Sequence, residues 1–132
     1  MSSAVQRVSM IFGWILIAFG ILGFLSAPDA LTANSARAAH LFGVFPINLV
    51  RSVLHLSWGV WGLAASQWRY SARRFARISG VVFIALTIYG IFSTSFAGFF
   101  PIGGNDIWLD AIIGVVLGYF GYTSREEALA GR

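Results

Sequence analysis

The segment RVSMIFGWILIAFGI, residues Arg7–Ile21, is matched by RISGVVFIALTIYGI at residues Arg77–Ile91. A second segment, GVFPINLVRSVLHLSWGV at Gly43–Val60, is matched by GFFPIGGNDIWLDAIIGV at Gly98–Val115. The first pair lies 70 positions apart and the second 55, so the copies differ mainly by about 15 extra residues before Gly43. Each copy contains an apolar segment, a loop ending in Phe-Pro-Ile and a second apolar segment. Such a repeat sets the expected architecture before any single residue is considered.

The composition is that of a membrane protein. Of the 132 residues, 58% are hydrophobic and 11% are charged, and the mean hydropathy of +0.78 is too high for a soluble domain of this size. A helix needs ~20 residues to cross ~30 Å of hydrocarbon. Four apolar segments approach that length: Val8–Leu25, Ile47–Ala65, Ile78–Phe96 and Ile107–Tyr122. The sequence therefore predicts an all-α, four-helix transmembrane bundle in one domain, with one repeat at residues 7–66 and the other at 77–122.

The positive charge indicates the orientation of the chain rather than a nucleic-acid partner. The net charge is +4, and all nine basic residues are Arg. With four crossings, seven lie on the side of the termini and of the connection between spans two and three: Arg7, Arg69, Arg73, Arg74, Arg77, Arg125 and Arg132. Arg37 and Arg51 lie on the other side. Because short basic loops stay in the cytoplasm, we predict a multi-pass protein of the bacterial inner membrane with both termini cytoplasmic.

Glycines follow the second and fourth predicted spans. They are Gly59 and Gly62 in one and Gly114, Gly118 and Gly121 in the other. Small residues let helix backbones approach closely in lipid, where no hydrophobic effect drives helices together. The repeat unit has two spans, so its copies insert in the same orientation, related by an axis along the membrane normal. We therefore predict that spans two and four contact each other in a central seam.

The outer loops carry a shared motif and few other signals. Phe45, Pro46 and Ile47 end the first loop, and Phe100, Pro101 and Ile102 occur at the matching place in the second half. Residues Ala30–Ala39 are Ala-rich and are predicted to form a short surface helix. Asn105 or Asp106 is the expected N-cap of the last span. His40 is expected to face solvent or lipid headgroups.

Four ionisable residues lie within the predicted spans. Arg51 and His55 are spaced i, i+4 on span two, and Asp106 and Asp110 have the same spacing on span four. The repeat matches Arg51 with Asp106 and His55 with Asp110. We predict a buried cluster in the outer half of the bundle, either with these pairs or with crossed pairs.

Three interpretations of this cluster remain open. Ionisable residues in a membrane cost ~2.5–3.5 kcal/mol each on insertion scales and often mark function. The cluster could lock the register of the bundle, it could carry protons or ions, or His55 could ligate haem or a pigment. The structural interpretation is preferred. No cysteine is present, two histidines make a dedicated metal site unexpected, and catalytic motifs are lacking, so neither an enzyme nor a cofactor is predicted.

The preferred function is that of a non-catalytic accessory subunit that packs against a larger membrane complex, such as a respiratory or photosynthetic one, or against a second copy. The alternative is a small transporter or proton-conducting protein that uses the four-residue cluster, and a further alternative is haem or pigment binding through His55. Trp14, Trp58 and Trp61 lie deep in the spans. They are expected to pack the bundle by default, or to face a lipid, a quinone or a neighbouring helix.

The run LFGVFPIN at Leu41–Asn48, followed by Leu54-His55-Leu56 and by GVWGLAAS at Gly59–Ser66, resembles the family called domain of unknown function 4383. That family contains small four-span bacterial membrane proteins with a Phe-Pro-x-Asn loop and a His-Leu-x-x-Gly helix. The resemblance covers most of the chain and is strongest over residues 41–66. In the second half, Asp110 stands where the pattern would place His, which argues against a paired-His site. The resemblance implies the topology and leaves the function open.

Overall fold

The structure, a computed structural model, describes residues 3–26, 39–42, 45–93, 95–96, 98, 100–101 and 105–124. These residues form four helices and two short two-stranded sheets. The helices are α1 (Ala4–Ser26), α2 (Leu49–Ala65), α3 (Arg69–Phe92) and α4 (Asp106–Thr123). The strands are β1 (Ala39–Leu41), β2 (Phe45–Ile47), β3 (Ser95–Phe96) and β4 (Phe100–Pro101).

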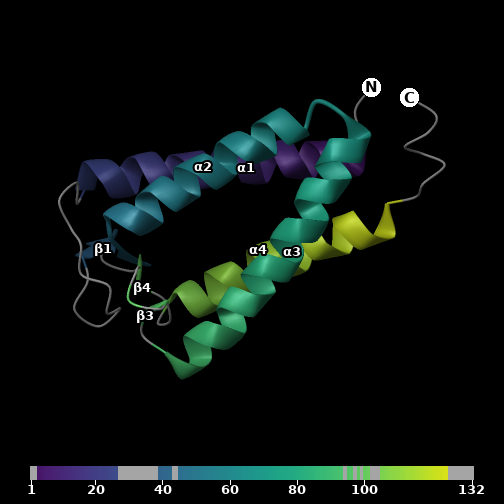
Figure 1. The fold of residues 1–132 in the computed structure, drawn as a ribbon. Coiled ribbons are helices and arrows are strands. Elements are labelled where there is room, and N and C mark those ends of the chain that lie inside the picture. The colour runs from purple at the N-terminus through teal and green to yellow at the C-terminus, as the bar shows by residue number, and fades with distance from the viewer. Residues whose placement is uncertain are drawn as a thin grey trace.

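The helices are arranged as two hairpins. The most extensive helix contacts are those of α1 with α2 and of α3 with α4. Figure 1 shows the two hairpins diverging, with all four strands near one end of the molecule. We call this the strand end. The opposite end, where α1 begins, α4 ends and residues 66–68 connect α2 to α3, is called the turn end.

Three of the helices are long and apolar enough to cross a membrane, namely α1, α3 and α4. Helix α2 has 17 residues, and at ~1.5 Å per residue it measures about 25 Å, less than the ~30 Å of a hydrocarbon core. The predicted second span began at Ile47, but Ile47 ends strand β2 and the helix starts two residues later.

The boundaries of the predicted third span, residues 78–96, were wrong. Helix α3 starts at Arg69, so the four arginines assigned to a connecting loop (Arg69, Arg73, Arg74 and Arg77) lie in its first turns. Arginine is a good helix former, and the helix therefore continues past the apolar segment. At the other end Ser93 has extended backbone, and Ser95 begins strand β3. The connection between the hairpins is only residues 66–68.

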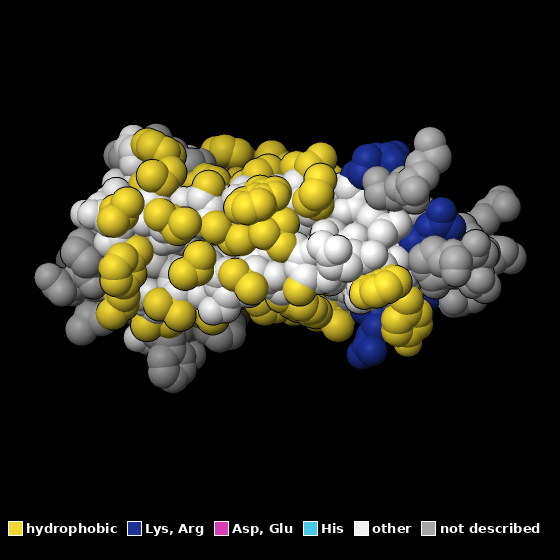
Figure 2. All heavy atoms as spheres, turned by 90° about the horizontal axis from the view of Figure 1, so that it is seen from above, with side chains coloured by type: hydrophobic (Ala, Val, Ile, Leu, Met, Phe, Trp, Pro, Cys, Tyr) yellow, Lys and Arg dark blue, Asp and Glu magenta, His cyan; other side chains and the backbone are white. Residues whose placement is uncertain are grey.

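The surface has the pattern of a membrane protein. Figure 2 shows hydrophobic side chains over most of the face seen from above, and the arginines of this face at one end. Large exposed apolar side chains occur on all four helices, as with Trp14, Val60, Val81 and Val115. Basic turns beside a continuous apolar surface are typical of helices that end in the headgroup region.

The predicted glycine seam between spans two and four was wrong. In the first hairpin, a Cβ on Gly59 would lie 2.5 Å from the carbonyl oxygen of Gly13 in α1, and one on Gly62 would lie 3.1 Å from the Gly13 Cα. These glycines therefore let α2 approach α1. Ser9 adds a buried hydrogen bond, donating from Oγ to the Gly62 carbonyl oxygen at 2.7 Å.

The glycines of α4 act in the same way toward α3. A Cβ on Gly114 would lie 2.9 Å from the backbone nitrogen of Ile84, and one on Gly121 would lie 2.6 Å from that of Arg77. Gly118 faces Gly80, where a Cβ on Gly80 would lie 2.5 Å from the Gly118 Cα. Each glycine stripe thus serves mainly its own hairpin, since small residues let helix backbones approach closely. A Cβ on Gly62 would also lie 2.9 Å from Cζ of Phe75 in α3.

Aromatic side chains pack between the hairpins, from near the turn end to the middle of α2 and α3. Trp61 of α2 meets the fully buried Phe75 of α3 edge to face, with ring centroids 4.9 Å apart. Trp58 meets Phe83 in the same way at 6.0 Å, and its Nε1 donates a 2.8 Å hydrogen bond to Ser79 Oγ. Trp58 and Trp61 therefore pack between the hairpins, whereas Trp14 is 58% exposed.

The shared loop motif forms strands. Pro46 pairs with His40 in the antiparallel β1–β2 sheet, and Phe100 pairs with Phe96 in the β3–β4 sheet. Proline is accepted because each sheet has only edge strands. Ile102 and most of the predicted surface helix lie outside the described residues, and Ala39, its last residue, begins β1. Strand β4 also contacts β2 and α2, which brings the two loops together at the strand end.

Candidate functional site

The site begins at the first turn of α2. Asn48 has extended backbone and is the N-cap of the helix, and its Oδ1 accepts a 2.8 Å hydrogen bond from the backbone N–H of Arg51. A side-chain oxygen at this position satisfies one of the helix's free N–H groups. Because strand β2 ends one residue earlier, the Phe-Pro-Ile-Asn run fixes where α2 starts. It therefore sets the direction in which the Arg51 side chain leaves the helix.

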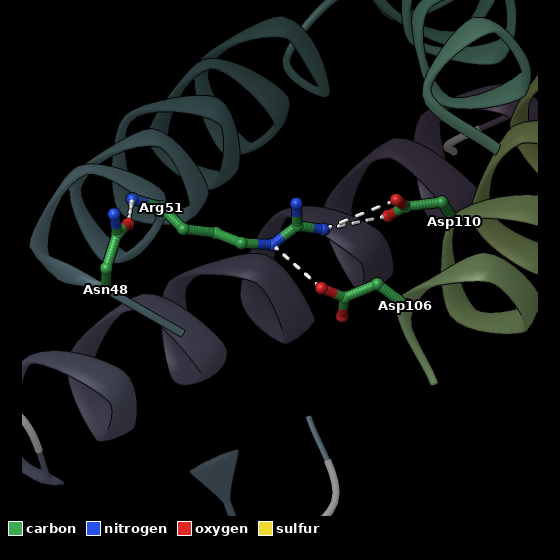
Figure 3. A network of polar contacts seen from close by, with 4 residues as sticks. All are labelled: Asn48, Arg51, Asp106 and Asp110. Carbon is green, nitrogen blue, oxygen red and sulfur yellow. Dashed lines mark hydrogen bonds and ion pairs between the residues drawn. The ribbon is translucent and has the colours of Figure 1, made fainter. Parts of the chain in front are cut away.

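Arg51 reaches from α2 to α4 (Figure 3). Its Nη2 donates to both carboxylate oxygens of Asp110, at 3.2 and 3.3 Å. Its Nε lies 3.5 Å from Oδ2 of Asp106, within ion-pair distance. Arg51 is 2% exposed and the two aspartates 1% or less. The result is a buried ion-pair cluster, which we call the Arg51 cluster, between helices that otherwise make few contacts with each other.

The cluster contains two carboxylates for one guanidinium, and the helix ends explain part of this ratio. The amino ends of α2 and α4 both lie at the strand end, and each carries a partial positive charge of ~+0.5. Asp106 is in the first turn of α4, where a negative charge is favoured, whereas Arg51 in the first turn of α2 is disfavoured. The second carboxylate thus offsets positive charge that comes from the backbone as well as from Arg51.

The fourth predicted residue, His55, does not join the cluster. Of the pairs left open, Arg51 with Asp106 and the crossed pair Arg51 with Asp110 both form, and His55 pairs with neither aspartate. The long Arg51 side chain reaches both carboxylates. The His55 ring instead lies edge-on to Phe19 of α1, with centroids 6.1 Å apart. Its Nδ1 is buried and has no hydrogen-bond partner among the described residues.

His55 lines a cavity of about 200 Å³ between α2 and α3. The lining residues are Arg51, Leu54, His55 and Trp58 of α2 and Val82, Phe83 and Leu86 of α3. The exposed walls are almost entirely apolar, because the guanidinium of Arg51 is turned toward Asp106 and Asp110 and Nδ1 of His55 is buried. Elsewhere in the described ranges, no three His, Asp or Glu side chains converge in a way that could hold a metal ion.

The structure thus brings together Arg51, Asp106 and Asp110, whereas His55 lies beside Arg51 at the cavity and makes no hydrogen bond or ion pair with the cluster. Sequence reasoning missed Asn48 as a member of the site. The signal was present, because an Asn directly after a Pro-Ile pair and before an apolar run is typical of an N-cap. Asn105, predicted with Asp106 as the cap of the last span, occupies the N-cap position of α4 but makes no side-chain cap bond. Its Oδ1 accepts from Trp108 Nε1 at 3.1 Å.

Residues 6–123 match the family model described as Domain of unknown function (DUF4383). The chain belongs to this family. The DUF4383 match spans the four helices, except for the first two residues of α1, and includes the whole Arg51 cluster. No curated protein and no solved structure matches the chain.

Proposed function

We propose that this DUF4383 protein is a non-catalytic accessory subunit of a larger assembly in the bacterial inner membrane. All four helices cross the bilayer, with α2 extended by strand β2 and its cap to reach the headgroups. The two hairpins are parallel copies of one duplicated unit. The turn end, with Arg7 and the basic turns of α3, faces the cytoplasm, as short basic segments do.

The observation that carries the accessory role is the position of Trp14. The midpoint of α1 falls at Ile15, so Trp14 lies at the level of the bilayer centre, and it is 58% exposed. Tryptophan favours the membrane interfaces, where its N–H can reach water or headgroups. An exposed tryptophan at the centre is better accommodated by a protein surface than by lipid tails.

The surroundings of Trp14 fit a helical partner. Exposed residues at helical spacing continue above and below it along one face of α1: Ile11, Ala18, Ile21 and Leu25. The small Ala18 leaves room beside the tryptophan, and small residues favour close helix approach in membranes. A face with one large anchor beside one small residue suits a helix of another membrane protein or of a second copy.

Site-specific photo-crosslinking tests this proposal. A benzophenone amino acid replaces Trp14 in one variant and Val115 in a control, since Val115 lies at the middle of α4 and is also exposed. We expect crosslinking in native membranes to yield one defined protein adduct at position 14 and none at position 115. Mass spectrometry distinguishes a second copy from another protein. Lipid adducts alone at both positions would contradict the proposal.

A second candidate, a proton-conducting protein, is supported by the ratio of two carboxylates to one arginine. A buried acid in excess of its cation can gain and lose a proton without breaking the remaining pair. In proteoliposomes with a pH gradient, this candidate requires a proton flux that Asp110→Asn abolishes while the protein remains folded. Equal proton permeability of protein-containing and empty vesicles would exclude it.

A further inference from the structure

We infer that the turn end of the α3–α4 hairpin binds an anionic phospholipid, with its phosphate at Arg74 and Arg77 and an acyl chain in a groove between the two helices. The inference requires α3 and α4 to lie in a membrane, for which both are long and apolar enough. It does not depend on the accessory role, because the Trp14 face lies on α1. Its support comes from the charge of the turn end, from the way Arg77 is held and from the groove beside it.

Positive charge is concentrated at the start of α3. Its first turns contain four arginines: Arg69, Arg73, Arg74 and Arg77. The first turn contains no acidic residue, and the N-cap Trp68 makes no side-chain cap bond, so the partial charge of the helix end, ~+0.5, adds to that of the arginines. Within the described ranges the acidic residues are Asp106 and Asp110, and both belong to the Arg51 cluster near the other end. The turn end therefore favours an anion from its surroundings, and a membrane supplies one as a lipid phosphate.

Arg77 is held in a fixed position that suits a phosphate. Its Nε donates a 2.7 Å hydrogen bond to the carbonyl oxygen of Gly121, and its guanidinium lies over the ring of Tyr122, with Cζ 4.7 Å from the centroid. Its Nη groups have no partner among the described residues. Arg74 is exposed on the same helix face, three residues earlier, and lies over the ring of Tyr70. The planar forks of two guanidiniums match the oxygens of one phosphate.

The depth of this pair corresponds to a lipid headgroup. Helix α3 has 24 residues and measures about 36 Å, about 6 Å more than a hydrocarbon core, so at least one of its ends extends into the headgroup region. Trp68 and Tyr70, both more than half exposed, lie at its start, and such aromatic side chains favour this interface. Side chains on a helix lean toward its N-terminus, which directs those of Arg74 and Arg77 toward the same level.

The groove begins next to Arg77. It lies between α3 and α4, measures about 480 Å³, and is lined in part by Tyr122, over whose ring the Arg77 guanidinium lies. Gly80, Gly114 and Gly118 also line it. A Cβ on Gly118 would meet only the Gly80 Cα, at 3.7 Å. The lack of a side chain at Gly118 therefore leaves the surface hollowed where the two helices meet.

The walls of the groove suit a hydrocarbon chain. Val81, Ile88 and Val115 line it and are each more than half exposed, and its surface is almost entirely apolar. From the level of Arg77 to that of Ile88, α3 extends about 17 Å, so a lipid with its phosphate at Arg77 has a path for one chain. Because lipid tails are as apolar as these walls, the chain contributes packing, and the charge provides most of the affinity difference between lipids.

The test is native mass spectrometry of the purified full-length protein, titrated in detergent micelles with palmitoyl-oleoyl phosphatidylglycerol or with phosphatidylcholine of the same chains. We expect the first phosphatidylglycerol to bind at least about fivefold more tightly, as expected for one additional arginine contact to an anionic lipid. A large excess of sn-glycerol 3-phosphate, which has the phosphate but no chains, should not displace it. Equal affinity for the two lipids, or displacement by glycerol 3-phosphate, would overturn the inference.

Variants of the basic pair test the phosphate site. Arg74→Gln removes an exposed guanidinium, and we expect the affinity for phosphatidylglycerol to fall about fivefold while that for phosphatidylcholine stays the same. Arg7→Gln is the matched control, because Arg7 is also exposed at the turn end but lies on α1. It should leave both affinities unaltered. Equal affinities of the two folded variants for phosphatidylglycerol would overturn the inference.

A variant of the groove tests the place of the chain. Gly118→Leu directs a side chain into the groove without a Cβ clash, and we expect about threefold weaker binding of phosphatidylglycerol, because the chain loses packing contacts. Val60→Leu, which enlarges an exposed residue of α2 away from the groove, should bind as the natural chain does. Unchanged binding by folded Gly118→Leu would contradict a chain in this groove.

Discussion

The α1–α2 and α3–α4 hairpins have similar helix packing within each hairpin, but they carry opposite charges at the site where they meet. In both, glycines bring the two backbones into direct contact, at Gly59 with Gly13 in one and at Gly80 with Gly118 in the other. Between the hairpins, the first contributes a cation at the strand end and the second contributes two carboxylates. The close glycine packing makes each hairpin a unit, and a charge difference at matched positions then joins the two units specifically.

The comparison teaches which contacts can hold a small membrane protein together. Close packing within one hairpin does not determine how that hairpin meets the other, because both hairpins are packed through glycines in the same way. The Arg51 cluster can form only between α2 and α4, and in only one register. Its burial makes it costly to leave incomplete, since a charge without its partner in a low-dielectric interior is strongly destabilising.

The largest expected effect comes from removing the cation. Arg51→Met leaves Asp106 and Asp110 buried without their partner, and we expect a loss of about 3–5 kcal/mol in the free energy of unfolding. Steric trapping in bicelles measures this quantity. Arg74→Met is the matched control, because Arg74 is exposed at the turn end and its loss should change stability little. Equal losses of unfolding free energy in the two variants would contradict a larger stabilising role for the buried arginine than for the exposed one.

Alanine substitutions at two glycines test the close helix contacts within the hairpins. Gly59→Ala forces a Cβ against the Gly13 carbonyl and the Ile17 backbone, so we expect a loss of about 1–3 kcal/mol. Gly118→Ala meets only the Gly80 Cα at 3.7 Å, an ordinary contact, and should be nearly neutral. Both are read from the same unfolding measurement. A Gly118→Ala variant as unstable as Gly59→Ala would contradict the open space that the structure shows beside Gly118 at the contact of α3 with α4.

The starts of α2 and α4 differ in capping, and this difference has a smaller effect. Asn48→Ala removes the hydrogen bond to the Arg51 N–H and should cost about 0.5–2 kcal/mol. Asn105→Ala removes no side-chain cap bond and loses the exposed contact to Trp108. Asn48→Ala should therefore lower the free energy of unfolding more than Asn105→Ala does when the two variants are measured together. The reverse order would contradict the assignment of Asn48 as the cap.

The smallest expected effects are those of two serines at matched positions. Ser9→Ala loses a bond within the first hairpin, and Ser79→Ala loses the bond from Trp58 that links the hairpins. Side-chain hydrogen bonds in membrane proteins average ~0.6 kcal/mol, and we expect each change to be of this size. A double-mutant cycle of Ser79→Ala with Trp58→Phe should give a coupling energy, whereas Ser9→Ala with Trp58→Phe should be additive.

The sequence was sufficient to predict the helices. Long apolar segments identified all four, because length and hydropathy can be recognised without any detail of packing. The errors lay at boundaries and in pairing. Arg69 to Arg77 were excluded from α3 because a hydropathy pattern detects the apolar part of a helix and not the helix itself. Two- and three-residue strands such as β2 and β4 carry no periodic signal at all.

The candidate site could be predicted in composition but not in geometry. Charge complementarity at matched positions pointed to Arg51, Asp106 and Asp110, and all three lie together. The role of His55 was not predictable, because it depends on how far one long side chain reaches and on the angle between two hairpins. No feature of a linear sequence encodes the cavity beside His55 either, because its lining residues on α2 and α3 lie 24 to 35 positions apart, as with Arg51 and Leu86 at the upper limit.

The central claim is that the Arg51 cluster is a structural joint between the hairpins. The most direct measurement is the free energy of unfolding of a triple variant, Arg51→Met with Asp106→Leu and Asp110→Leu. Replacing a complete buried ion-pair cluster by apolar side chains is often neutral or stabilising, so we expect the triple variant to recover to within about 1 kcal/mol of the natural chain. A triple variant as unstable as Arg51→Met alone would contradict the claim.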